Sequence, residues 1–198
     1  MSANSYLTPE ERAILESVRV GIAGAGGLGS NCAMHLVRAG VKHLTIADFD
    51  VVNESNLNRQ FFFRDQIGQK KVEAVKANLL RIEPDADIRA VDMRLDASSA
   101  REIFADCGIV VEAFDAVDAK VMLVSAFASS GKKLVTASGL AGWGRSNAMR
   151  VRKMGNIVAI GDGETSVDDG AAPISPRVGI AAAMQANAVI SLLLGCEP

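Results

Sequence analysis

The sequence is poor in cysteine, and its cysteines are not arranged in pairs. Cys32, Cys107 and Cys196 stand far apart in a chain of 198 residues, and none belongs to a C-x-x-C motif. This spacing excludes a disulfide framework and a zinc site built from neighbouring cysteines. Because few unpaired cysteines are typical of a reducing compartment, we expect a cytoplasmic location.

The chain also lacks a strong charge of one sign. It has 21 basic and 23 acidic residues, a formal net charge of −2, and Lys and Arg never form a run longer than two. Such a balance argues against binding to nucleic acid or to an anionic membrane surface. No run of about 18 uncharged apolar residues is present, as a membrane span would need. Residues 1–12 are polar and contain no apolar signal region.

Aliphatic residues, by contrast, are abundant. Hydrophobic residues make up 49% of the sequence, but aromatic residues only 5%. A core built from aliphatic side chains and Ala is common where helices cover parallel strands. The length fits one domain, which we expect to span residues 1–198.

Short apolar runs alternate with amphipathic segments, which predicts a βα succession. Thr8, Pro9 and Glu11 predict a capped helix first. Gly155 and Asn156 separate two alternating runs, which predicts an antiparallel hairpin. The expected class is a doubly wound, Rossmann-like α/β fold, with a mainly parallel sheet and antiparallel strands at its C-terminal end. Expected strands are 18–23, 43–47, 88–91, 108–113, 133–137, 146–152 and 156–160, and later helices are 26–39, 69–82, 98–105, 117–129 and 178–194.

A glycine-rich turn joins the first strand to the next helix. Its G-x-G-x-x-G pattern, in this context, predicts a nucleotide site in which backbone amides and a helix N-terminus bind phosphate. Asp48 ends the second strand, where a carboxylate can accept hydrogen bonds from ribose hydroxyls. The motif does not distinguish NAD from ATP. The turn consists of Gly24, Ala25, Gly26, Gly27, Leu28 and Gly29.

Further polar residues follow other strand ends. Arg59 can present a planar fork to phosphate, and Asn56 can donate an amide hydrogen bond. A lysine at the start of the helix 69–82, Lys70 or Lys71, would form a second anion site. Asp115 follows the strand 108–113 and suits Mg²⁺. In that helix we expect Val72, Val75, Leu79 and Ile82 to face inward and Lys70, Lys71, Glu73 and Lys76 mostly outward.

The order of these motifs resembles the ubiquitin-activating-enzyme-like superfamily. Within it, the stretches GIAGAGGLGSN, IADFD, SNLNRQFF and VVEAFD look like the short form of the thiamine-biosynthesis adenylyltransferases, the ThiF group. The segment 176–194 also resembles the family. The matching motifs are G-x-G-G-L-G-S at 24–30, D-x-D at Asp48 and Asp50, S-N-L-x-R-Q at 55–60, G-x-x-K at 68–71, and the aspartate at Asp115.

The resemblance implies roles for individual residues in an ATP site. The glycine turn would hold the nucleotide, and Asp48 would bind its ribose. Asn56 and Arg59 would contact the triphosphate. Lys71 would stabilise the transferred phosphoryl group, with Lys70 a weaker candidate, and Asp115 would hold Mg²⁺. Arg59, Lys71 and Asp115 are thus the expected catalytic residues, whereas Asp50 is expected to be structural.

The implied reaction is adenylation of a carboxylate. The C-terminal glycine of a ubiquitin-like sulfur carrier ending in Gly-Gly would attack the α-phosphorus of ATP, with thiamine thiazole synthesis the expected pathway. Two other substrates remain open, namely a carrier from another sulfur-insertion pathway and a tRNA-bound carboxylate. From other classes, an NAD-dependent oxidoreductase would leave Arg59, Lys71 and Asp115 unused, and a non-catalytic nucleotide-binding subunit would not need them.

The sequence departs from the family pattern in its sulfur chemistry. The paired C-x-x-C zinc motif is missing, and no cysteine lies in the expected crossover loop, at about residues 161–177. A separate protein is therefore expected to deliver sulfur. Family resemblance also implies a homodimer. One interpretation of the acidic residues of the crossover loop, Asp162, Glu164, Asp168 and Asp169, is that they are solvated, whereas the resemblance implies that this loop covers the carrier's tail near the adenylate.

Overall fold

The computed structural model describes residues 6–166 and 170–198, so Asp168 and Asp169 lie outside the described residues. Within these ranges the strands form one seven-stranded sheet in the order β3-β2-β1-β4-β5-β7-β6. The strands are β1 (Arg19–Ala23), β2 (His43–Asp48), β3 (Asp87–Asp92), β4 (Ile109–Glu112), β5 (Lys133–Ala137), β6 (Arg150–Met154) and β7 (Ile157–Gly161). The helices are α1 (Pro9–Ser17), α2 (Gly27–Arg38), α3 (Lys71–Leu80), α4 (Ala97–Ile103), α5 (Val117–Phe127) and α6 (Ser175–Leu193).

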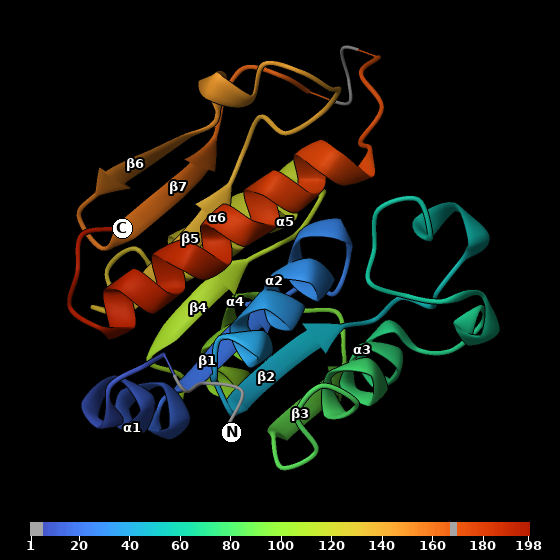
Figure 1. Cartoon of the computed structure of the whole chain (residues 1–198). Coiled ribbons are helices and arrows are strands. Elements are labelled where there is room, and N and C mark those ends of the chain that lie inside the picture. The colour runs from blue at the N-terminus through green and yellow to red at the C-terminus, as the bar shows by residue number, and fades with distance from the viewer. Residues whose placement is uncertain (1–5, 167–169) are drawn as a thin grey trace.

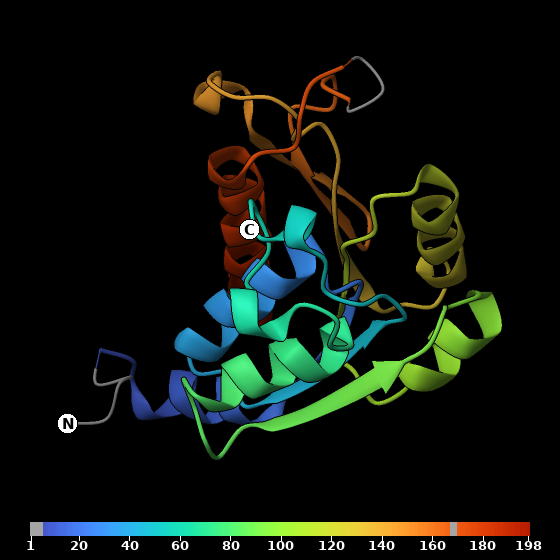
Figure 2. The same cartoon turned by 90° about the vertical axis from the view of Figure 1, so that its right-hand side faces the viewer.

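Helices cover both faces of the sheet. Figure 1 shows α2, α3 and α6 in front of the strands, and Figure 2 shows α4 and α5 on the opposite side. Each layer has its own buried cluster of apolar side chains. Because both faces are covered, the central strands consist mostly of apolar residues, and every residue of β4 is buried, including Glu112 at its end. The predicted doubly wound α/β fold is confirmed.

The strand order reverses direction at the middle of the sheet. From β1 the chain moves outward to β2 and β3, then crosses to β4 on the other side of β1. The strand pairs from β3 to β7 are parallel, and only β6 runs antiparallel to its neighbour, β7. In such sheets ligands bind outside the carboxyl ends of the strands, at the point of reversal. That point lies between β1 and β4.

Local sequence signals place most element boundaries within a few residues. The capping box predicted for the first helix is present, since Thr8 accepts from the Glu11 amide and donates its own amide to the Glu11 carboxylate. The predicted strand 146–152 is partly wrong, because its first residues form a 3₁₀ turn after Arg145, whose φ is +49°. The strand therefore begins only at Arg150.

The C-terminal helix is long and apolar enough to cross a membrane by length and composition alone. Half of this apolar stretch is buried, because the helix packs along α2 and against β5 and β7. A core helix of a soluble domain meets the same criteria. The helix begins at Ser175, three residues before the predicted start, with Pro176 in its first turn.

One acidic residue of the crossover loop is not solvated, contrary to expectation. Asp162 is only 5% exposed and pairs with Arg177, which is 2% exposed. The Arg177 guanidinium also donates to the Gly144 carbonyl oxygen at 2.6 Å. Since Asp162 follows β7 and Arg177 lies in the first turn of α6, this ion pair joins the two ends of the loop.

The electrostatic environment favours the ionised form of Asp162. Burial raises its pKa, but hydrogen bonds from the Thr165 and Glu164 amides and from the Thr165 hydroxyl lower it, as does the positive charge of Arg177. The net result is a pKa below the ordinary aspartate value. A depressed carboxylate pKa stabilises the folded state above the unfolded pKa, and that contribution is lost as the pH falls through the folded value.

We therefore predict that Asp162→Asn lowers the free energy of unfolding at pH 7 by about 3–5 kcal/mol, because it leaves the buried Arg177 unpaired. Glu164→Gln is the matched control. It removes the exposed Arg145–Glu164 pair of the same loop and should cost less than about 1 kcal/mol. Urea unfolding at pH 7 and pH 3 measures both effects. Two results would contradict this explanation. The first is an equal loss of unfolding free energy in the two variants. The second is a difference in unfolding free energy between wild type and Asp162→Asn that is as large at pH 3 as at pH 7.

Candidate nucleotide-binding site

The glycine turn is shaped by close contacts that leave no room for side chains. Gly24 has a φ of +103°, and a Cβ there would lie 2.7 Å from the Ala113 carbonyl oxygen. A Cβ on Gly29 would lie 1.8 Å from the Gly24 carbonyl oxygen. By contrast, a Cβ on Gly26 would meet nothing closer than 3.8 Å. Gly24 and Gly29 thus shape the turn, whereas Gly26 has open space beside it.

Asp48 binds the turn directly. One carboxylate oxygen accepts from the Ala25 amide at 2.7 Å, and the other accepts from the Asp50 amide at 2.8 Å. Asp48 therefore lies at the end of β2 beside the turn, where the sequence predicted a ribose-binding carboxylate. Each of its oxygens retains a lone pair for a hydroxyl donor.

The loop after β2 is anchored to the first turn of α2. Asn31 donates from its side-chain amide to the Arg59 carbonyl oxygen at 2.8 Å, and Ser30 Oγ accepts from the Phe61 amide at 3.0 Å. Consequently the Arg59 side chain lies beside Gly27, with its Cγ 3.4 Å from the position of a Cβ on that glycine. The sequence motif S-N-L-x-R-Q is thereby placed against the glycine turn.

The two predicted triphosphate ligands of this loop differ in how they are held. The Arg59 guanidinium donates to the Asn58 side-chain oxygen at 2.9 Å and to the Ser55 carbonyl oxygen at 3.4 Å. The Asn56 side-chain oxygen accepts from the Asn53 amide at 3.0 Å, which caps the local turn. This leaves the Asn56 amide group to donate to a ligand.

Lys71 faces inward, contrary to the predicted orientation. It is only 7% exposed, and its ammonium lies 2.8 Å from an Asp50 carboxylate oxygen. Residues 68–71 pair with residues 50–52 through several backbone hydrogen bonds, so helix α3 begins at Lys71 and not at Gln69. The predicted structural role of Asp50 takes a specific form, which is to hold the Lys71 ammonium.

Asp115 lies just beyond the carboxyl end of β4. Its side chain is exposed, and within the described part of the chain it takes part in no hydrogen bond or ion pair. Its neighbour Phe114 lies 3.4 Å from the position of a Cβ on Gly24. Glu112, at the end of β4, pairs in register with Ala23. The turn after β4 is thus adjacent to the glycine turn.

The sequence did not predict an ion pair near Asp115 that joins a buried glutamate to a partly buried lysine. Glu112 is fully buried, and its carboxylate lies 3.0 Å from the Lys120 ammonium. A glutamate inside the apolar run GIVVEA is a signal that could have revealed it, because a buried carboxylate requires a partner.

The cysteines and histidines lie apart from this constellation. Cys32 and Cys107 are buried as expected, and burial raises the pKa of their thiols to about 12 and about 11, respectively. Exposed Cys196 lines a cavity of about 510 Å³ at the amino ends of β5 and β7.

The two histidines also lie away from the glycine turn. The His43 Nδ1 atom lies 3.3 Å from an Asp87 carboxylate oxygen. Burial and the positive charge of Arg38 lower the pKa of His35. Neither histidine contacts the glycine turn among the described residues.

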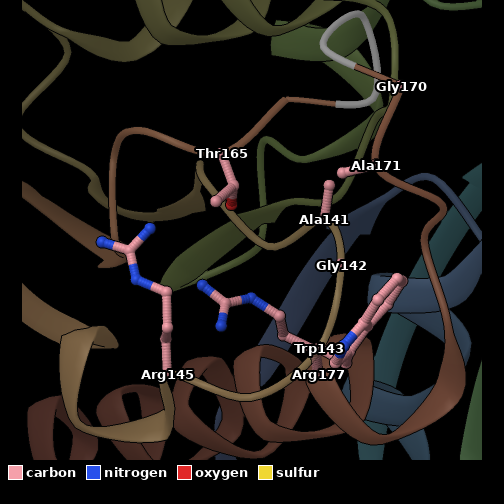
Figure 3. Close-up of a pocket in the computed structure, with 8 residues that line it drawn as sticks. All are labelled: Ala141, Gly142, Trp143, Arg145, Thr165, Gly170, Ala171 and Arg177. Atoms are coloured by element: carbon pink, nitrogen blue, oxygen red, sulfur yellow. The ribbon is translucent and has the colours of Figure 1, made fainter.

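A second cavity, of about 230 Å³, lies under the crossover loop. Figure 3 shows the side chains of Arg145 and Arg177 extending toward Thr165, with Trp143 at the edge. Val178 follows Arg177 and lies 2.9 Å from the position of a Cβ on Gly27. The cavity and the glycine turn are therefore neighbours across the start of α6.

The sequence is similar to those of known adenylyltransferases. The model of the ThiF family matches residues 3–198. A molybdopterin-synthase adenylyltransferase of Salmonella typhimurium is 31% identical over 192 residues, which cover 93% of this chain and 76% of that protein. An adenylyltransferase and sulfurtransferase UBA4 of Eremothecium gossypii is 31% identical over 182 residues, which cover 91% of this chain. The chain spans 39% of that UBA4 protein and 43% of another.

The fold is also found in solved structures. The E. coli tRNA N6-threonylcarbamoyladenosine dehydratase TcdA, in complex with AMP, superposes with a TM-score of 0.87. The match covers 98% of this chain and 93% of TcdA at 19% identity. It establishes the shared architecture.

We predict that Gly29→Ala lowers stability, whereas Gly26→Ala weakens nucleotide binding. Gly29→Ala forces a Cβ into the Gly24 carbonyl and should lower the free energy of unfolding by about 1–3 kcal/mol or more. Gly26→Ala should leave stability nearly unchanged but weaken nucleotide binding, because its Cβ enters the space where phosphate would meet backbone amides. Denaturant unfolding and calorimetric titration with a non-hydrolysable ATP analogue separate the two. A large stability loss for Gly26→Ala would contradict the assignment.

Proposed function

The chain belongs to the ThiF family, and from this membership we propose that it is an ATP-dependent adenylyltransferase. Its substrate is the C-terminal glycine carboxylate of a ubiquitin-like sulfur carrier. The observation that supports this most is the gathering of phosphate-binding and cationic groups at one sheet edge. A dehydrogenase would have no use for Arg59, Lys71 and Asp115 beside the glycine turn.

The chemistry requires charge compensation more than proton transfer. A carrier carboxylate is ionised at neutral pH, so it can attack the α-phosphorus without a general base. An oxygen–phosphorus bond forms, and the bond to the pyrophosphate leaving group breaks. Arg59 and Lys71 offset the repulsion between the anionic carboxylate and the triphosphate, and they stabilise the charge that develops on pyrophosphate.

The residues present fit a magnesium ion that arrives with the nucleotide. In the described part of the chain, no group of three or more His, Cys, Asp or Glu side chains could hold a metal by itself. Mg²⁺ is commonly bound by one or two carboxylates together with substrate phosphates, and the exposed Asp115 can supply one. The ion would supply positive charge to the phosphates.

The cavity under the crossover loop offers a route for the carrier's tail. It adjoins the glycine turn through Val178, and Gly142 and Gly170 line it. A tail of two glycines fits a cavity of about 230 Å³ better than bulkier residues would. The buried Asp162–Arg177 pair would hold the base of the loop in place.

We further propose that the carrier serves thiamine thiazole synthesis, that the enzyme is a homodimer and that a separate protein delivers sulfur. The sequence motifs favour the thiamine pathway. The cysteines favour a separate sulfur donor, because two of the three are buried with raised thiol pKa values and Cys196 lies at the opposite sheet edge from the glycine turn. A tRNA-bound carboxylate is the second candidate substrate, because the chain shares its architecture with TcdA, which is named as a tRNA-modifying dehydratase.

ATP–pyrophosphate exchange tests the proposed function. The chain is assayed with candidate carriers, with each carrier lacking its terminal glycine, and with tRNA bearing a carboxylate. We expect exchange only with an intact Gly-Gly carrier. Exchange with tRNA alone would favour the second candidate, and no exchange together with NAD binding would overturn the adenylyltransferase assignment.

We predict that Lys71→Ala lowers the exchange rate about 10²–10³-fold, the usual cost of removing one preorganised donor to a developing anion. Lys70→Ala is the matched control, because Lys70 is the preceding residue but pairs with Asp92 and is half exposed. It should leave the rate within a few-fold of wild type. Circular dichroism checks that both variants fold. Equal rates in the two variants would remove Lys71 from the catalytic residues.

A further inference from the structure

We propose that Glu112 and Lys120 are positioning residues that fix the Asp115 carboxylate for Mg²⁺ binding. This inference rests on the proposed function, since it concerns the metal that accompanies ATP. It assigns a purpose to an ion pair with a fully buried carboxylate, which the reaction itself does not require.

Glu112 is held from several directions. One oxygen of its carboxylate accepts from the Phe114 amide at 2.7 Å and from the Lys120 ammonium at 3.1 Å. The other oxygen accepts from the Thr136 hydroxyl at 2.5 Å and from Lys120 at 3.0 Å. The Glu112 carbonyl oxygen accepts from the buried Gln185 side chain of α6 at 2.9 Å. The end of β4 is therefore bound to β5, α5 and α6.

Lys120 completes this network. Its ammonium also donates to the Ala137 carbonyl oxygen at 3.1 Å, at the carboxyl end of β5. Removing charges from water costs free energy, and an apolar pair of similar volume is often as stable or more stable. Stability alone thus gives little reason for an ion pair here. The pair fixes a geometry, because the carboxylate directs hydrogen bonds that an apolar side chain could not make.

The geometry that it fixes is that of the turn carrying Asp115. Since the Asp115 side chain has no partner in the described part of the chain, its position depends on its backbone. The Phe114 amide, bound to Glu112, lies immediately before it, and Lys120 lies after it, in the first turn of α5. Both sides of Asp115 are thereby tied to one carboxylate.

The same segment also contacts the glycine turn. The Ala113 amide donates to the Ala23 carbonyl oxygen at 2.9 Å, and the Ala113 carbonyl oxygen lies 2.7 Å from the position of a Cβ on Gly24. The Glu112 network therefore sets where the turn that carries Asp115 lies relative to the glycine turn. Mg²⁺ demands near-ideal octahedral geometry, so a small displacement of one ligand weakens its binding.

The test measures Mg²⁺ dependence of nucleotide binding, not turnover. Calorimetry gives the affinity for a non-hydrolysable ATP analogue in EDTA and across a Mg²⁺ titration. Two variants are compared with wild type, Lys120→Met and the neutral double variant Glu112→Gln/Lys120→Met. Each should raise, about tenfold or more, the Mg²⁺ concentration that gives half of the maximal gain in analogue affinity. Changes of this size are usual when residues that hold a metal ligand are replaced. Affinity in EDTA should change less than about twofold. Lys120→Arg should restore most of the Mg²⁺ response.

Lys132→Met is the matched control. The Lys132 ammonium donates to the Ala105 and Cys107 carbonyl oxygens at 2.8 Å, before the amino end of β4. This variant should lower the melting temperature without changing the Mg²⁺ midpoint. The double variant keeps the test valid if Lys120→Met fails to fold. An unchanged midpoint in the double variant, or an equal shift in Lys132→Met, would overturn the inference. A wild type that binds no analogue would instead overturn the proposed function.

Discussion

The close approach of the glycine turn to the end of β4 is the constraint on which the site depends. Gly24 and Gly29 pack backbone against backbone, and the Ala113 carbonyl lies where a side chain on Gly24 would stand. No other residue type permits this contact without displacing β1 from β4. Because those strands are neighbours at the reversal of the sheet, the contact places the turn that carries Asp115 next to the glycine turn. The chemistry of the site follows from this backbone arrangement.

Paired charges surround that arrangement. Asp50 holds Lys71, Glu112 holds Lys120, and Asp162 holds Arg177. In each pair at least one partner is buried, where an unpaired charge would be costly. Each pair has a different role. We propose that the first holds a cation for the triphosphate and that the second fixes the turn that carries Asp115, whereas the third joins the two ends of the crossover loop.

The fold could be predicted from sequence because its signals are local. The Thr8 capping box, the apolar strands and the Gly155–Asn156 turn each depend on neighbouring residues. The motif residues were brought to one edge for a general reason, since the carboxyl ends of parallel strands meet there. The orientation of Lys71 and the burial of Asp162 could not be predicted. Each depends on a partner at least 15 residues away, which helical periodicity and loop composition do not reveal.

The central claim is that nucleotide binds at the carboxyl edge between β1 and β4. Backbone amide chemical shifts, followed by NMR as a non-hydrolysable ATP analogue and Mg²⁺ are added, test it most directly. Binding at this edge should produce large shifts for residues 24–29, 56–59 and 115. It should cause little change for residues 131–133 and 195–197, which lie at the amino edge of the sheet. Shifts confined to the amino edge, or none at the glycine turn at saturating ligand, would contradict this claim.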